Sequence, residues 1–305
     1  MTPPFISYVA FNRLGLTAAS LKSILATSED FEMHIIDSNS KDNTWDFLQS
    51  LKDERIKSIT KFPVNAGPIY ALNFNLAKRR PDQYFFTIDS DVCIETNDWI
   101  TRFMTIFNAF PNIGVLGMMR PKPYLQIYPE VTPRVNGSLS CLELKNGFVD
   151  VILDFAHGCL MCLKPELISE IGYWSEENCF GDAEICPRVN NYTSYRVGFM
   201  SDINYKPIVD ITMEQQIACD QCSAQEFCKL IKENKTCFVL HTTKRKNESF
   251  VNKFKWKYLE TFKELEEGKR TAYCASIFDP KSTDGHLYHR DWALENFSFY
   301  IENAN

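Results

Sequence analysis

The segment FFTIDSDV, residues 85–92, decides the fold and points to the site. It is a nearly continuous apolar run that ends in two aspartates one residue apart, Asp89 and Asp91. Such a run is typical of a strand that is buried on both faces, as in a parallel sheet covered by helices. Two carboxylates at the end of a buried strand repel each other unless a cation or an opposite charge lies between them. The segment therefore predicts both a buried strand and a compensating charge at its carboxyl end.

On both sides of this segment the chain alternates between strand-like and helix-like patterns. Apolar runs predict strands over residues 5–9, 31–37, 56–62, 84–89 and 114–119. Helical spacing of apolar residues predicts helices over residues 16–25, 42–51, 68–80 and 99–110. This alternation predicts an α/β domain whose mostly parallel sheet carries helices on both faces. Ligands bind such sheets outside the carboxyl ends of the strands, so we expect Asp37, Asp89 and Asp91 along one edge.

The composition is that of a globular protein. The 305 residues are 45% hydrophobic and 24% charged, and the net charge of −6 gives no help in binding nucleic acid or anionic membranes. We expect no signal peptide and no spanning helix, because no run approaches ~18 uninterrupted apolar residues. The 11 cysteines are scattered, often inside apolar runs, and odd in number. This usage favours a reducing, cytoplasmic location.

The two aspartates also predict a metal site. Hard divalent cations such as Mg²⁺ and Mn²⁺ take oxygen ligands of this kind, and Mg²⁺ often shares them with substrate phosphates. The alternative is that both aspartates cap the next helix. That helix has cap candidates of its own in Thr96, Asn97 and Asp98, which weakens the alternative.

Five segments, in order, resemble the GT-A-fold glycosyltransferases, most closely the inverting family 2. They are SYVAFNR (7–13), IIDSNSKDNT (35–44), NAGPIYALNFNLA (65–77), IDSDV (88–92) and FGDAEICPRV (180–189). The resemblance extends over about residues 5–200 and implies a Rossmann-like GT-A fold. It implies an enzyme that moves a sugar, with inversion, from a UDP-, GDP- or dTDP-sugar donor to an acceptor hydroxyl.

The resemblance also implies roles for individual residues on the donor side. Nucleotide-binding positions would be Ala10, Asn12, Arg13, Asp37, Asn65, Gly67, Asp89 and Ser90. Asp37 would read the base, and Asp89 and Asp91 would hold Mn²⁺ or Mg²⁺, with the late His241 as a third ligand. Arg13 would contact the diphosphate, cap a helix or lie in solvent, and the sequence leaves these three open.

On the acceptor side, the resemblance places the general base at Asp182. Gly181 stands where many relatives have glutamate, which leaves open which acid is the base. For Glu184 we prefer a structural ion pair with Arg188, four residues further on.

We expect a catalytic domain over residues 1–206, with a nucleotide-binding half (about 1–119) and an acceptor half (about 120–206). A mainly helical extension over residues 207–305 would pack on it. Residues 120–138 carry four of the 14 prolines and predict a long loop. In the extension, Cys219, Cys222 and Cys237 could join His241 in a structural zinc site; the two roles of His241 exclude each other, and we prefer the catalytic metal. Residues 244–265 predict a basic, aromatic helix that docks on the protein or, as the alternative, meets an anionic acceptor or a membrane surface.

Several alternatives stay open at this point. The acceptor is a glycan, a lipid carrier, a protein or a modified base, and the aromatic C-terminal segment packs on the main domain or on another subunit. A nucleotidyltransferase would want a glycine-rich basic signature after the first strand, which AFNRLG (10–15) matches poorly. A catalytically inactive nucleotide-sugar-binding module is disfavoured by the intact pair Asp91 and Asp182.

Overall fold

The computed structural model describes residues 2–119, 129–146, 148–149, 152–153, 155–176, 181–200, 203, 205–207 and 259–280. The elements, in chain order, are β1 (Phe5–Ala10), α1 (Leu14–Leu25), β2 (Glu32–Asp37), α2 (Thr44–Ser50), β3 (Ile56–Lys61), α3 (Pro68–Leu76), β4 (Phe85–Asp89), β5 (Val92–Ile94), α4 (Trp99–Ala109), β6 (Ile113–Met118), β7 (Val131–Asn136), β8 (Leu139–Leu144), β9 (Phe148–Val149), β10 (Ile152–Leu153), β11 (His157–Leu163), α5 (Pro165–Ile171), α6 (Gly181–Tyr192), β12 (Arg196–Met200) and β13 (Tyr205–Pro207). Residues 259–266 form a further helix.

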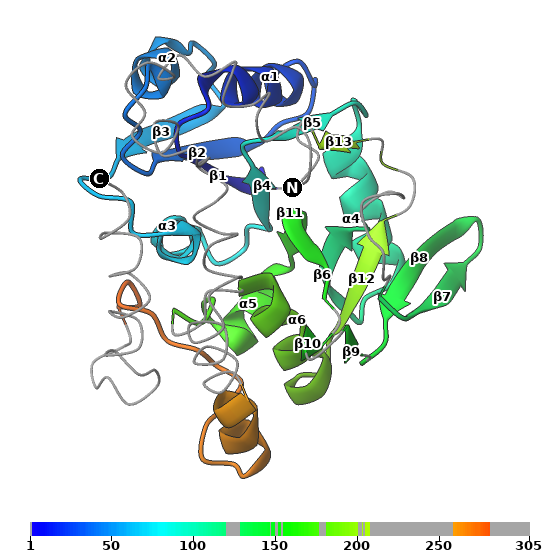
Figure 1. The fold of residues 1–305 in the computed structure, drawn as a ribbon. Helices are drawn as coiled ribbons and strands as arrows, with labels where there is room; N and C mark the ends of the chain where they lie inside the picture. The colour runs from blue at the N-terminus through cyan, green and yellow to red at the C-terminus, as the bar shows by residue number, and fades with distance from the viewer. Residues whose placement is uncertain are drawn as a thin grey trace.

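A nine-stranded sheet forms the centre of the molecule, in the order β3-β2-β1-β4-β11-β6-β12-β8-β7 (Figure 1). Strands β3, β2, β1 and β4 are parallel, and β12 is parallel to β6. Strand β11 runs antiparallel to both of its neighbours, β4 and β6. The predicted α/β fold with a mostly parallel sheet is confirmed.

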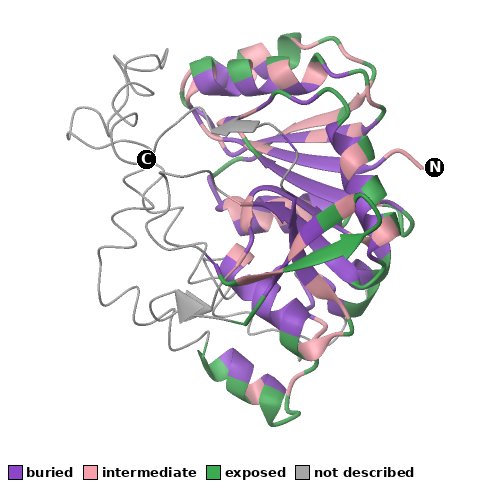
Figure 2. Ribbon diagram, turned by 90° about the vertical axis from the view of Figure 1, so that its right-hand side faces the viewer, coloured by how far each residue is buried: buried purple, intermediate pink, exposed green. Residues whose placement is uncertain are grey.

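Helices cover both faces of this sheet, as the apolar runs predicted. Helices α1, α2 and α4 pack on one face, where Leu21, Leu48 and Phe103 join one core cluster. Helices α3, α5 and α6 pack on the other, where Leu167 and Ile185 join a second cluster. Figure 2 shows the resulting pattern of buried strands and helices whose outer sides are exposed.

The hairpin of β7 and β8 differs from the sequence-based expectation. We predicted a long loop over residues 120–138, but Val131–Asn136 is a strand that pairs with β8 along its whole length. Pro133 is tolerated because β7 is the edge strand of the sheet, where a missing backbone donor faces solvent. Gly137, with a φ of 61°, and Ser138 form the two-residue turn that joins the two strands.

Part of the C-terminal region lies against α5 and α6 (Figure 1). Cys274 bridges Gly172, its N–H donates to the carbonyl of Ile171 (2.8 Å), and its carbonyl accepts from the N–H of Tyr173 (2.9 Å). Of the predicted helix over 244–265, residues 259–265 are described and are helical; the others lie outside the described residues. None of the described helices combines the length and the apolar character that crossing a membrane requires.

Candidate functional site

Three parallel strands end at the same edge of the sheet and bring the predicted donor-side residues together. Asp37, the last residue of β2, pairs in register with Ala10 of β1, and Asp89, the last residue of β4, pairs with Val9. Asp89 is exposed, whereas Asp37 is completely buried. Chain positions 10, 37 and 89, which are far apart in sequence, therefore lie along one edge.

The turn after β1 is held in an unusual backbone conformation. Asn12 and Arg13 have φ values of 53° and 63°, in the left-handed region that residues other than glycine seldom adopt. The N–H of Asn12 donates to the Ser40 hydroxyl, and the Asn12 side-chain carbonyl accepts from the N–H of Lys41, both at 2.8 Å. These two bonds tie the loop after β1 to the loop after β2. Consecutive strained residues held in this way are typical of functional sites.

One of the two carboxylate oxygens of Asp37 is available to a ligand. Its Oδ1 accepts a hydrogen bond from the N–H of Ser40 (2.9 Å). Its Oδ2 is buried, lies 3.7 Å from the Lys61 ammonium, and accepts no hydrogen bond from any residue that the structure describes. A buried acceptor of this kind fits a ligand that brings an N–H donor.

An opposite charge compensates Asp91, the second aspartate of the segment FFTIDSDV. The guanidinium of Arg13 lies 2.7 Å from the Asp91 carboxylate, and the two side chains are 16% and 28% exposed. The Nε of Arg13 is buried and has no acceptor among the described residues. Arg13 also begins α1 as its N-cap residue, without a side-chain cap. Of the three roles left open for Arg13, the structure therefore excludes the free side chain in solvent.

The helix-capping alternative for Asp89 and Asp91 fails. The helix that follows them, α4, has Asp98 as its N-cap residue, and neither aspartate of the segment takes that place. The Glu29 carboxylate instead accepts the backbone N–H groups of Ile100 (2.5 Å) and Thr101 (2.7 Å). Asp89 and Asp91 are therefore not cap residues of α4, and they lie at the edge of the sheet.

The loop before α3 follows β3 toward the same edge. The N–H of Gly67 donates to the side-chain oxygen of Asn65 (3.0 Å), and both residues are buried. Gly67 has φ 87° and ψ 164°, a conformation that needs glycine, and Pro68 then opens the helix.

Asp182, the predicted general base, lies in the first turn of α6. Its Oδ2 accepts the N–H of Gly158 (3.3 Å), and its Oδ1 accepts the N–H of Ala183 (2.9 Å). Gly158 stands near the start of β11, and because β11 runs antiparallel to β4, that start lies beside the end of β4. The structure therefore brings Asp182 to the edge where Asp89 lies.

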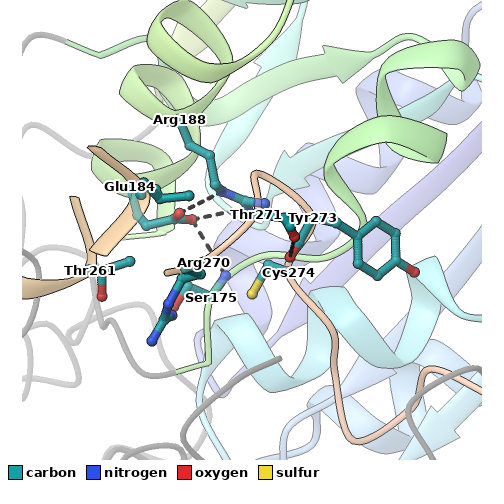
Figure 3. Close-up of a pocket in the computed structure, with 9 residues that line it drawn as sticks. Ser175, Glu184, Arg188, Thr261, Arg270, Thr271, Tyr273 and Cys274 are labelled. Atoms are coloured by element: carbon teal, nitrogen blue, oxygen red, sulfur yellow. Dashed lines mark hydrogen bonds and ion pairs between the residues drawn. The ribbon is translucent and has the colours of Figure 1, made fainter. Parts of the chain in front are cut away.

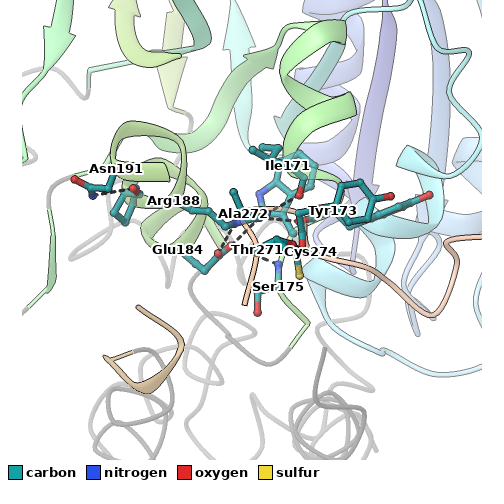
Figure 4. Close-up of polar contacts among 12 residues, drawn as sticks. Ile171, Tyr173, Ser175, Glu184, Arg188, Asn191, Thr271, Ala272 and Cys274 are labelled. Atoms are coloured by element: carbon teal, nitrogen blue, oxygen red, sulfur yellow. Dashed lines mark hydrogen bonds and ion pairs between the residues drawn. The ribbon is translucent and has the colours of Figure 1, made fainter. Parts of the chain in front are cut away.

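Glu184 forms the ion pair that we expected, and the pair is buried. Its carboxylate lies 2.6 Å from the Nε of Arg188, and both side chains are 2% exposed. Arg188 also donates to the carbonyls of Ile171 (2.6 Å), Tyr173 (2.7 Å) and Ala272 (2.9 Å), as Figure 4 shows. These carbonyl contacts were not foreseen, although an arginine among Ile185, Cys186 and Val189 signals a buried charge that needs several acceptors.

The pocket drawn in Figure 3 lies beside this ion pair and is not a substrate site. It is lined by Ser175, Glu184, Arg188, Thr261, Leu265, Arg270, Thr271, Tyr273 and Cys274. Its volume of about 10 Å³ is the space of about one water molecule.

The proposed metal ligands are only partly described. Among the described residues, no three His, Cys, Asp or Glu side chains stand close enough together to hold a metal ion. His241, Cys219, Cys222 and Cys237 lie outside the described residues, so both hypotheses for them stay predictions.

Comparisons with known proteins show what part of the chain and its fold are similar to. The family model described as glycosyl transferase family 2 matches residues 6–129. Among solved structures, mannosyltransferase PcManGT from Pyrobaculum calidifontis, in complex with GDP-Man and Mn²⁺, matches with a TM-score of 0.52 and 17% identity, over 76% of this chain and 65% of that chain. S. aureus TarS 1–349 in complex with UDP matches with a TM-score of 0.50 and 15% identity, over 72% of this chain and 65% of that chain. No curated protein sequence matches the chain.

The chain has the GT-A fold, and its residues 6–129 are similar to glycosyl transferase family 2. It spans 65% of the length of each of the two structures named above.

Proposed function

We propose that the chain is a metal-dependent glycosyltransferase, which moves a sugar with inversion from a nucleotide-sugar donor to an acceptor hydroxyl. The observation that carries the proposal is the gathering of Asp37, Asp89, Asp91 and Asp182 at one edge of the sheet. The family match supports it, and so do two structural neighbours whose complexes hold GDP-Man with Mn²⁺ and UDP.

In the donor half, the free oxygen of Asp37 accepts the imide N–H of the base. Uracil, thymine and guanine carry such an N–H beside a carbonyl, so we propose a UDP-, dTDP- or GDP-sugar. Lys61 lies 3.7 Å from this oxygen and is 34% exposed, so its side chain turns outward when the base enters. We assign the surrounding wall of the nucleotide site to Ala10, Asn12, Asn65, Gly67 and Ser90.

Asp89 and Asp91 supply oxygen donors that fit Mn²⁺ or Mg²⁺. We propose His241 as a third ligand. When bound, the cation supplies Lewis-acid neutralisation of the departing nucleoside diphosphate. Arg13, whose guanidinium lies 2.7 Å from Asp91 at this edge, would donate hydrogen bonds to the diphosphate.

In the acceptor half, Asp182 takes the proton of the attacking hydroxyl. The hydroxyl oxygen forms a bond to the anomeric carbon while the bond from that carbon to the diphosphate breaks, and its electron pair leaves with the nucleotide. Attack from the face opposite the leaving group gives inversion. Gly158 holds the Asp182 carboxylate toward the edge through its N–H.

We propose residues 1–206 as the catalytic domain and residues 207–305 as an extension of it. We also propose a cytoplasmic location, or one peripheral to a membrane. The six cysteines in the described residues are thiols that form no disulfide there, which fits a reducing compartment.

The test measures nucleoside diphosphate release from UDP-, GDP- and dTDP-sugars, with Mn²⁺ and with EDTA. We expect turnover that needs the metal, and a loss of about 100-fold or more in Asp91→Asn and Asp182→Asn. Asp98→Asn is the matched control, because Asp98 is an exposed carboxylate at the start of α4. Donor binding without release would establish an inactive module, and pyrophosphate release would establish a nucleotidyltransferase.

A further inference from the structure

Strand β11 is irregular next to the candidate base. On its β4 side, β11 pairs continuously from Leu160 opposite Ile88 to Leu163 opposite Phe85. On its β6 side, the register moves from His157 opposite Met118 directly to Met161 opposite Gly117. The register with β6 is thus irregular between His157 and Met161, although β11 lies between β4 and β6 (Figure 1). Irregularities of this kind beside active sites aim a particular group.

Gly158, in this irregular segment, is held on both sides by hydrogen bonds. Its carbonyl accepts the Thr87 hydroxyl at 2.9 Å, and its N–H donates to the Asp182 carboxylate at 3.3 Å. Thr87 belongs to β4, is 4% exposed, and stands two residues before Asp89. A continuous path, Thr87 to Gly158 to Asp182, therefore connects the strand of the candidate metal ligands with the candidate base.

The contact between Gly158 and Asp182 is close and easily lost. A Cβ placed on Gly158 would lie 3.8 Å from the Asp182 Cβ and 3.9 Å from its Oδ2, which is ordinary contact. At 3.3 Å, this hydrogen bond is slightly longer than the usual range for an N–H donor. A small shift of Gly158 would break this bond and change how the carboxylate is held, with the N–H of Ala183 still bonded to its Oδ1.

We propose that Thr87 is a positioning residue for Asp182. The proposal rests on the proposed function. The Thr87 hydroxyl holds the Gly158 carbonyl and so restrains the position of Gly158. The N–H of Gly158 then holds the carboxylate where it meets the acceptor hydroxyl. Thr87 contacts neither substrate nor metal in this role.

The experiment compares Thr87→Val, which keeps the shape and removes the hydroxyl, with Thr87→Ser, which keeps the hydroxyl. The matched control is Thr27→Val, because Thr27 is also 4% exposed and its hydroxyl also donates to a carbonyl, that of Ile24, at 2.8 Å. Donor hydrolysis by water, with UDP-GlcNAc and GDP-Man as probes, gives kcat, KM and the pH profile of kcat. We expect Thr87→Val to lower kcat by about 10-fold or more, because misplacement of a reacting group is costly.

The KM for the donor should stay unchanged in Thr87→Val, and the pH profile of kcat should shift, because the surroundings of the base change. Thr87→Ser should restore kcat and the profile, and Thr27→Val should alter neither. Wild-type kcat and profile in Thr87→Val, or the same losses in Thr27→Val, would overturn the proposal.

A second readout needs no turnover. The protein labelled with ¹⁵N-glycine has 12 glycines, and Gly158→Ala identifies the amide signal of Gly158. In the wild type this signal should move on Asp182→Asn, and in Thr87→Val it should no longer respond. An unchanged response would overturn the positioning role, even where absent donor turnover has already refuted the proposed function.

Discussion

Arg188→Met tests whether one buried ion pair holds the acceptor side of the fold together. Arg188 and Glu184 are each 2% exposed and lie 2.6 Å apart on successive turns of α6. The same guanidinium donates to the carbonyls of Ile171, Tyr173 and Ala272. Burial alone would lower the pKa of Arg188, but the adjacent carboxylate raises that pKa above its ordinary value, so Arg188 stays charged.

The magnitude follows from what the substitution leaves behind. Methionine fills most of the space but leaves the Glu184 carboxylate buried without its counter-charge, and breaking a buried pair in this way costs about 3–5 kcal/mol. Three carbonyls also lose their donor, and each unsatisfied buried group adds about 1–3 kcal/mol unless water reaches it. These costs are not additive, so we expect about 4 kcal/mol of lost unfolding free energy. The double variant with Glu184→Leu should recover part of the loss, since it removes the buried charge.

Urea unfolding measured by tryptophan fluorescence gives the free energy, and Trp174, at 2% exposure, reports on this region. The matched control is Arg134→Met. Arg134 forms two hydrogen bonds of 2.9 Å with Glu143, but its side chain is 50% exposed. An exposed pair is worth about 0–1 kcal/mol. Equal losses in the two variants would refute the reasoning that burial gives the Arg188 pair its importance.

Three further predictions concern backbone, pH and metal. Gly172→Ala should lower the unfolding free energy by about 2 kcal/mol or more, because φ is +67° and a Cβ would lie 2.4 Å from the Cys274 carbonyl; wild-type urea stability would contradict this. Burial lowers the pKa of His34 from 6.5 to about 4. The unfolding free energy of the wild type relative to His34→Phe should therefore be highest above pH 6.5 and fall as the pH drops from 6.5 to 4. If the unfolding free energies of the two proteins changed in parallel with pH, this prediction would be wrong. Arg13→Gln should tighten Mn²⁺ binding to the donor-free protein in calorimetry, because the guanidinium 2.7 Å from Asp91 competes with the cation; unchanged affinity would show that it does not.

The first half of the fold could be predicted from the sequence because β1, β2 and β4 are mostly buried. A strand covered by helices must be apolar throughout, so the runs that end at Asp37 and Asp89 mark both the strand and its end. The parallel arrangement then fixes which residues share an edge. Gly67 was instead indicated by the family resemblance of residues 65–77, and its φ of 87° before Pro68 explains why the residue is glycine.

Contacts made by long side chains between distant segments could not be predicted in this way. The pairing of Arg13 with Asp91 depends on a left-handed turn that local propensity disfavours in arginine. The carbonyl partners of Arg188 include Ala272, which is 84 positions away in the chain. Strand β7 was missed because its residues are mostly exposed, so no apolar pattern distinguishes it from a loop.

The two halves of the proposed reaction depend on a single strand. Strand β4 presents Asp89, the proposed ligand of the metal and diphosphate, at its end, and Thr87, whose hydroxyl holds Gly158, two residues earlier. Both lie within one regular strand, so the pleat of β4 sets the spacing between Asp89 and Thr87. Holding groups on one rigid strand favours a reaction in which an acceptor hydroxyl must be aligned with an anomeric carbon. The proposed positioning of Asp182 therefore explains why a polar residue, Thr87, stands within the buried strand FFTID. The aspartates of the same segment belong to the proposed donor side.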